Sequence, residues 1–193
     1  MTKRVWMAAL LSTLLVGCAA SLTPRQTDGL EEAQRFCNEV TRAYRVSEVR
    51  VHPNTAERGW IYYNQGLRWI TIQPRFLGSE DQPVLLARTL GEVAMGTSGH
   101  DTQSVLSINR TTVDIMIRFL GMTERQAIDR LARLFLDVNA TFVEYAQSLR
   151  LGSRPTAWPV SYLHPCAQLK ALWTSYALGD PQPACEPGPG LKL

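Results

Sequence analysis

The segment LARTLGEVAMGTSGH, residues 86–100, predicts the helix around which the fold is built. An apolar helix runs into Glu92, and glycines at positions 96 and 99 indicate where it ends. Read by itself, the segment indicates a core helix in which Met95 fills space. Glu92 is then expected to pair at the surface with Arg88, four residues earlier on the same face.

A second interpretation concerns positions 91 and 95, which are four residues apart and therefore share one helix face. Histidines at both positions could hold one zinc ion, with Glu92 polarising a metal-bound water. Gly91 has no side chain, and the thioether of Met95 is a poor zinc ligand. We therefore expect no metal here and no cofactor.

Other histidines give no convincing metal site either. The chain has three histidines, His52, His100 and His164. A set made of His100, Asp101, His164 and Cys166 matches no known ligand spacing.

Helices dominate the regions around this segment. A Ser79–Gln82 capping-box pattern with Pro83 predicts where the central helix begins. Alternation and turn residues predict a strand over 48–53 and a hairpin over 59–73 that turns at 64–66. Apolar periodicity predicts further helices over 30–44, 109–120, 123–150 and 164–178. The fold class is therefore α+β: a mostly helical single domain with a small sheet of about three strands.

The N-terminal residues predict a lipoprotein. A basic start, an apolar run and the sequence LVGC indicate a lipoprotein signal peptide over 1–17. Cys18 then becomes the lipidated N-terminus, carrying acyl chains such as palmitate. We expect a tether over 18–29, a globular domain over 30–178, and a Pro- and Gly-rich tail over 179–193.

Location and charge restrict the partners. Ala19 follows the cysteine, which by resemblance to bacterial lipoproteins favours the periplasmic face of the outer membrane, with the lipid as membrane anchor. The formal net charge is +3, and loss of Lys3 and Arg4 with the signal leaves +1. Such a balance argues against a nucleic-acid partner.

Three cysteines remain besides Cys18 in an oxidising compartment. Cys166 and Cys185 bracket the last helix and its tail, so we expect them to form a disulfide bond. Cys37 is then a buried thiol or a competing partner.

Four motifs in order resemble the gluzincin metallopeptidases of the HtpX and BepA type, in which a hairpin precedes an HExxH helix. GEVAMGTSGH lies over HExxH and a trailing histidine, with Glu92 and His100 in register. RTTVD lies over ExxAD, so Arg110 takes the ligand position and Asp114 the aspartate. YLHPCAQLKALW is similar to THPxxxxRIxxL, with His164 on the HP pair. The resemblance covers roughly residues 30–175 and implies a minimal gluzincin-like scaffold.

The departures from that family concern all three zinc ligands, because Gly91, Met95 and Arg110 replace His, His and Glu. Arg110 is a fixed positive charge where a dication would lie. Glu92 would remain as a base without a metal-bound water. The resemblance thus implies a degenerate site that is not catalytic, formed by Gly91, Glu92, Met95, Arg110, Asp114 and His164. An ion pair of Arg110 with Glu92 or Asp114 is one way in which it would be closed.

The family binds its substrate extended along an edge strand, and backbone groups of such a strand keep their pairing capacity without a metal. We therefore expect a non-catalytic binding or scaffold protein for segments of envelope proteins, with the edge within 59–73. Two alternatives stay open: an active metallopeptidase with atypical ligands, and a purely structural lipoprotein.

Overall fold

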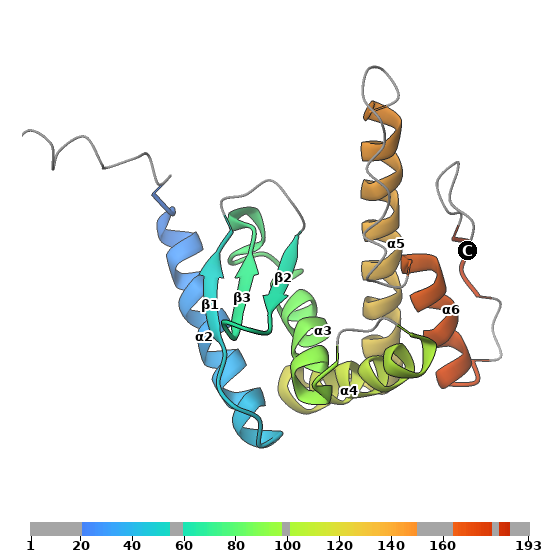
Figure 1. The fold of residues 1–193 in the computed structure, drawn as a ribbon, viewed down its shortest axis with the longest axis horizontal. Coiled ribbons are helices and arrows are strands. Elements are labelled where there is room, and N and C mark those ends of the chain that lie inside the picture. Colours follow the sequence, from blue (N-terminus) through green and yellow to red (C-terminus); the bar gives the residue numbers. More distant parts are fainter. Residues whose placement is uncertain (1–20, 55–59, 98–100, 150–163, 179–181, 186–193) are drawn as a thin grey trace, which may run out of the picture.

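The computed structural model describes residues 21–54, 60–97, 101–149, 164–178 and 182–185 (Figure 1). Its elements are α2 (Pro24–Ala43), β1 (Arg50–Pro53), β2 (Ile61–Asn64), β3 (Trp69–Ile72), the 3-10 helix η1 (Pro74–Phe76), α3 (Gln82–Met95), α4 (Thr102–Leu120), α5 (Glu124–Leu149) and α6 (Pro165–Ser175). The predicted α+β fold, mostly helical with a small sheet, is confirmed. None of the described helices is both long and apolar enough to cross a membrane.

The sheet has three strands in the order β1-β3-β2. β2 and β3 pair antiparallel, which confirms the predicted hairpin, and β1 adds parallel to the other side of β3. Side chains alternate between the two faces of a strand, and Val51, Ile70 and Ile72 point to the buried face. Because β3 is central, β2 is an edge strand.

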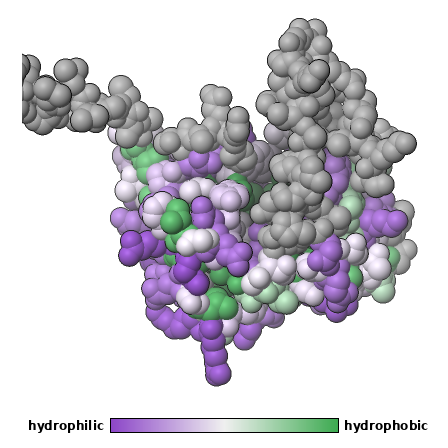
Figure 2. Space-filling model, in the orientation of Figure 1, coloured by the Kyte–Doolittle hydropathy of each residue, from purple (hydrophilic) through white to green (hydrophobic). Residues whose placement is uncertain are grey.

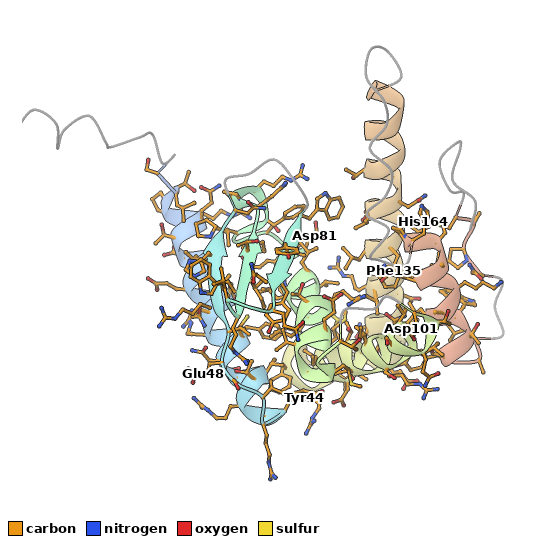
Figure 3. All side chains as sticks on the ribbon, viewed as in Figure 1. Tyr44, Glu48, Asp81, Asp101, Phe135 and His164 are labelled. Carbon is orange, nitrogen blue, oxygen red and sulfur yellow. A yellow bond between two sulfur atoms is a disulfide. The ribbon has the colours of Figure 1, made fainter. Side chains whose placement is uncertain are left out.

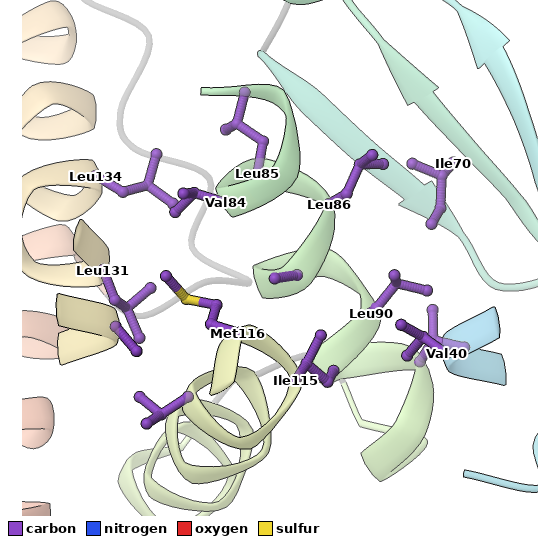
Figure 4. Close-up of a cluster of buried hydrophobic side chains, with 14 of the residues drawn as sticks. Val40, Ile70, Val84, Leu85, Leu86, Leu90, Ile115, Met116, Leu131 and Leu134 are labelled. Carbon is purple, nitrogen blue, oxygen red and sulfur yellow. The ribbon is translucent and has the colours of Figure 1, made fainter. Parts of the chain in front are cut away.

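Helix α3 lies between the two halves of the molecule. α2 and the sheet are on one side of it, and α4, α5 and α6 are on the other (Figure 1). Its apolar side chains therefore contact both halves, as Figure 4 shows for Val84, Leu85, Leu86 and Leu90 of α3, Val40 of α2, Ile70 of β3, Ile115 and Met116 of α4, and Leu131 and Leu134 of α5. A helix that is apolar on most sides is stable only in such a central position.

Helix α2 begins earlier than predicted, and residues 24–29 are helical instead of belonging to a tether over 18–29. The sequence signal for this start is a capping box. The Thr23 hydroxyl accepts from the Gln26 backbone N–H at 3.3 Å, and the Gln26 side chain accepts from the Thr23 N–H at 2.9 Å. These reciprocal bonds satisfy two N–H groups that a helix start otherwise leaves unpaired.

The predicted Ser79–Gln82 capping box of α3 is wrong. The Ser79 hydroxyl donates to the Phe76 carbonyl at 2.7 Å. The N-cap of α3 is Asp81, the residue immediately before the first residue of the helix. The Gln82 side chain instead accepts from the Gly78 N–H at 2.6 Å and donates to the Gly29 carbonyl at 2.9 Å. The Gln82 side chain therefore bonds backbone groups from two segments that lie far apart in sequence, around Gly29 and Gly78.

Helix α4 also begins earlier than the predicted range 109–120. Asp101 caps it, accepting from the Ser104 N–H at 2.9 Å. The predicted cap of α5 is confirmed, because the Thr123 hydroxyl accepts from the Gln126 N–H at 3.3 Å. The two helices are thus separated by a short turn with defined bonds at both ends.

The C-terminal end of α2 has an unusual residue. The Arg45 N–H donates to the Arg42 carbonyl at 3.2 Å, and the Val46 N–H donates to the Thr41 carbonyl at 3.0 Å. These two bonds define a Schellman motif, whose left-handed position is usually glycine. Arg45 occupies that position with φ of 54°.

Candidate functional site

A largely buried ion pair holds Glu92. Arg88 Nη1 lies 2.9 Å from Glu92 Oε1, and the two side chains are 11% and 13% exposed. The predicted pairing of Glu92 with Arg88 is confirmed, but the pair lies in the interior instead of at the surface.

The pair belongs to a network that joins three helices. Arg88 Nη2 donates to the side-chain oxygen of Gln168 on α6 at 3.0 Å. Asn109 on α4 donates to the Gln168 backbone carbonyl at 3.4 Å. Asn109 and Gln168 were not predicted as site residues; both are buried polar residues, and polar residues near them in sequence hide any signal. The network ties α3 and α4 to α6.

Position 91 faces helix α4 at very close range. A Cβ atom built on Gly91 would lie 2.5 Å from Thr112 Oγ1 and 3.1 Å from the Ile108 carbonyl oxygen. Thr112 Oγ1 itself donates to that carbonyl at 2.8 Å. A histidine at position 91 would therefore require α3 and α4 to separate.

The side chains at the other predicted positions of the degenerate site, Met95, Arg110 and Asp114, share no contact with one another among the contacts described. Met95 is 42% exposed, and Arg110 is exposed as well. Asp114 accepts hydrogen bonds from the Tyr44 hydroxyl and from Arg118, the latter at 3.2 Å. Burial, together with this bond to Asp114, raises the pKa of Tyr44 to about 12.

The expected closing ion pair of Arg110 is wrong. Glu92 pairs with Arg88, and Asp114 pairs with Arg118. Arg110 and Arg118 both lie on α4, four residues before and four residues after Asp114, and the carboxylate bonds Arg118.

His164 caps helix α6. Its Nδ1 accepts from the Cys166 N–H at 3.2 Å, and burial lowers its pKa. Figure 3 shows His164 well separated from Tyr44, whose hydroxyl bonds Asp114, so the structure does not bring His164 and Asp114 together.

Cys18 and His100 lie outside the described residues. Within those residues, no group of three or more His, Cys, Asp and Glu is arranged to hold a metal ion.

The predicted disulfide is confirmed, with 2.09 Å between the sulfurs of Cys166 and Cys185. Cys37 is a free, buried thiol, which agrees with one of the two predicted roles. Burial raises its pKa to about 12. Since only a thiolate is an effective nucleophile, Cys37 is unreactive at neutral pH.

A different feature, the outer edge of β2, presents unpaired backbone groups. The Gln73 N–H donates to the Trp60 carbonyl at 2.9 Å. Hydrogen-bonded pairs recur at every second residue of an antiparallel ladder, so Tyr62 directs its backbone groups towards β3. Ile61 and Tyr63 consequently direct theirs outward, and no described strand pairs with them.

Exposed apolar side chains concentrate on the same hairpin. Among the described residues, four large hydrophobic side chains are exposed, and three of them belong to the hairpin: Tyr62 at 51%, Leu67 at 55% and Trp69 at 38%. Figure 2 shows small separate hydrophobic patches among hydrophilic side chains on the viewed face. The hairpin therefore combines free backbone groups with exposed apolar surface.

Replacing Gly91 with alanine tests the helix contact. We expect the free energy of unfolding to fall by roughly 1 kcal/mol or more, because overpacking costs more than the helix propensity that alanine adds. Removing the opposing hydroxyl with Thr112→Ala should relieve part of that loss. Urea unfolding of both single variants and the double variant measures the coupling. Additive effects, within about 0.5 kcal/mol, would contradict the contact.

Replacing Glu92 separates a structural from a catalytic role. Glu92→Ala leaves Arg88 buried and unpaired and should lower the free energy of unfolding by about 3–5 kcal/mol. Glu92→Gln keeps an acceptor and should cost less.

Neither wild type nor Glu92→Gln should contain stoichiometric zinc or cleave unfolded casein, as measured by elemental analysis and gel electrophoresis. Casein cleavage by the wild type that Glu92→Gln abolishes would show that the site is catalytic.

Comparison with known proteins adds no relative. No family model, curated protein or solved structure matches the chain.

Proposed function

We propose that the protein is a non-catalytic binding protein anchored by lipid on Cys18 at the periplasmic face of the outer membrane. Its ligands are extended segments of other envelope proteins, which pair with the outer edge of β2.

The observation that carries this proposal is the open edge of β2. Ile61 and Tyr63 turn backbone donors and acceptors away from β3, and no described strand covers them. An extended peptide can satisfy these groups by adding a fourth strand. The exposed hairpin side chains Tyr62 and Trp69 supply apolar surface beside that strand.

The surroundings of Glu92 support a role without catalysis. Its carboxylate is bonded to Arg88, and position 91 packs against Thr112. No observation on the described residues favours an active metallopeptidase with atypical ligands. A purely structural lipoprotein would leave the β2 edge unused.

Cys18 lies close to the fold along the chain. Helix α2 begins at Pro24, six residues after Cys18. Six extended residues span at most about 20 Å, so a lipid on Cys18 would hold the folded domain close to the membrane surface.

Replacement of Cys18 tests the anchor. We expect Cys18→Ala to lose incorporation of labelled palmitate and to leave the membrane fraction, because acyl chains supply most of the membrane affinity. Fractionation of cells expressing each form measures both properties. Equal partitioning of wild type and Cys18→Ala into detergent would contradict lipidation at this residue.

Replacement of Tyr63 tests the edge. Proline at this position removes the outward N–H, whereas valine removes the aromatic ring and keeps the N–H. We expect Tyr63→Pro to lose the envelope partner captured by the full-length protein and Tyr63→Val to retain it. Hydrogen exchange on the wild-type complex should show protection of the Ile61 and Tyr63 amides.

The amides of Tyr62 and Asn64, which face β3, provide the folding control and should stay protected in both variants. Equal capture by Tyr63→Pro and Tyr63→Val, without protection of the outward amides, would mean that partners use another surface.

A further inference from the structure

A hollow of about 480 Å³ opens at the end of the sheet where the β2–β3 hairpin turns. Its walls come from the loop between α2 and β1, from the hairpin turn and from the C-terminal end of α3. Six of the residues that line it are Arg45, Val46, Tyr63, Arg68, Val93 and Gly96.

The charged side chains of this lining are all cationic. Arg45 and Arg68 line the hollow, and no Asp or Glu among the described residues does. Glu48 is nearby in sequence, but only its backbone carbonyl is engaged, accepting from Arg68 Nε at 3.1 Å. The hollow is therefore complementary in charge to an anion.

The two arginines differ in how their side chains are used. Arg68 donates to the backbone carbonyls of Ser47 and Glu48 and so links the hairpin turn to the α2–β1 loop. The Arg45 side chain is exposed, and among the described residues it has no hydrogen bond or ion pair. Arg45 is thus the cation that is available to a ligand.

Both arginines have left-handed backbones, with φ of 54° at Arg45 and 57° at Arg68. Glycine adopts this conformation without steric cost, so an arginine in it needs a reason. The carbonyl bonds of Arg68 supply one. For Arg45, the two backbone bonds of the Schellman motif at the end of α2 supply one, and they place its exposed side chain beside the hollow.

Tyr63 connects the hollow to the edge of β2, because it lines the hollow and carries an outward backbone N–H. An extended segment that pairs with β2 and continues past Asn64 would reach the hollow. Val46 and Val93 line it as well, next to the space that the methylenes of an acidic side chain would fill.

Resting on the proposed function, we propose that this hollow binds a glutamate or aspartate carboxylate of the extended partner segment, with Arg45 as its cation. Guanidinium and carboxylate form short, charge-assisted hydrogen bonds in a planar arrangement. The carbonyls at the end of α3 offer little opposition, because the Gly96 and Thr97 N–H groups already donate to two of them.

Two matched peptides test the proposal on the full-length protein in detergent micelles. One is acetyl-Thr-Val-Thr-Val-Thr-Glu-amide, and the other has Gln in place of Glu. We expect the Glu peptide to bind about tenfold more tightly, as measured by calorimetric titration. Arg45→Gln should abolish this preference while leaving binding of the Gln peptide unchanged. Arg42→Gln is the matched control, because Arg42 is an exposed cation of α2 that does not line the hollow.

The outcomes separate this inference from the proposed function. Equal binding of both peptides, with protection of the Ile61 and Tyr63 amides from hydrogen exchange, would overturn the carboxylate site and leave the edge proposal standing. Equal loss of preference in Arg45→Gln and Arg42→Gln would also overturn it, because it would indicate general surface charge. If neither peptide protects those amides, the edge proposal fails, and this inference fails with it.

Discussion

At the crossing of α3 and α4, a Cβ atom on Gly91 would lie 2.5 Å from Thr112 Oγ1, so the two helices approach as closely as a glycine permits. This contact sets the position of the central helix. α3 in turn provides the surface on which the sheet and α2 pack from one side, and α4 and α5 from the other. A side chain at position 91 would push these halves apart, because a packed interior has few voids that could absorb it.

The hydrogen-bond network of Arg88, Glu92 and Gln168 fixes how α6 is placed against α3. Apolar contacts alone allow α6 some freedom to slide, whereas a guanidinium bonded at once to Glu92 and Gln168 requires one arrangement of α3 and α6. The Cys166–Cys185 disulfide joins the start of α6 to the C-terminal segment. The carboxylate of Glu92 is thus held inside the fold by bonds that also position α6.

A sheet of only three strands leaves the molecule with exposed backbone. β1 and β2 each have a strand on one side only, but the Gln34 side chain of α2 accepts from the Val51 N–H of β1 and donates to the nearby Val49 carbonyl. The same hairpin carries exposed aromatic side chains, and its turn borders the hollow that contains Arg45 and Arg68. Free backbone groups, exposed aromatic side chains and the cationic hollow therefore lie together at the hairpin, whereas the carboxylate of Glu92 is bonded inside the fold.

Local patterns were enough to predict most of the elements. Apolar periodicity located the helices and alternation around residues 64–66 located the hairpin, because each signal depends on neighbours along the chain. The Arg88–Glu92 pair was predictable for the same reason. The early starts of α2 and α4 are also encoded locally, by the side-chain caps Thr23 and Asp101. The disulfide was predicted because Cys166 and Cys185 bracket the last helix and its tail.

Only the tertiary structure decided what those residues face. That Gly91 meets α4 instead of an open cleft depends on how two helices cross, and spacing within one helix does not contain that information. The bond of Gln82 to Gly29 likewise joins segments far apart in sequence, and the strand order that makes β2 an edge strand depends on the addition of β1 to β3. Sequence determined which helices and strands form, because those depend on short-range propensity. Which surfaces are buried and which stay free for a partner was decided by packing between distant segments.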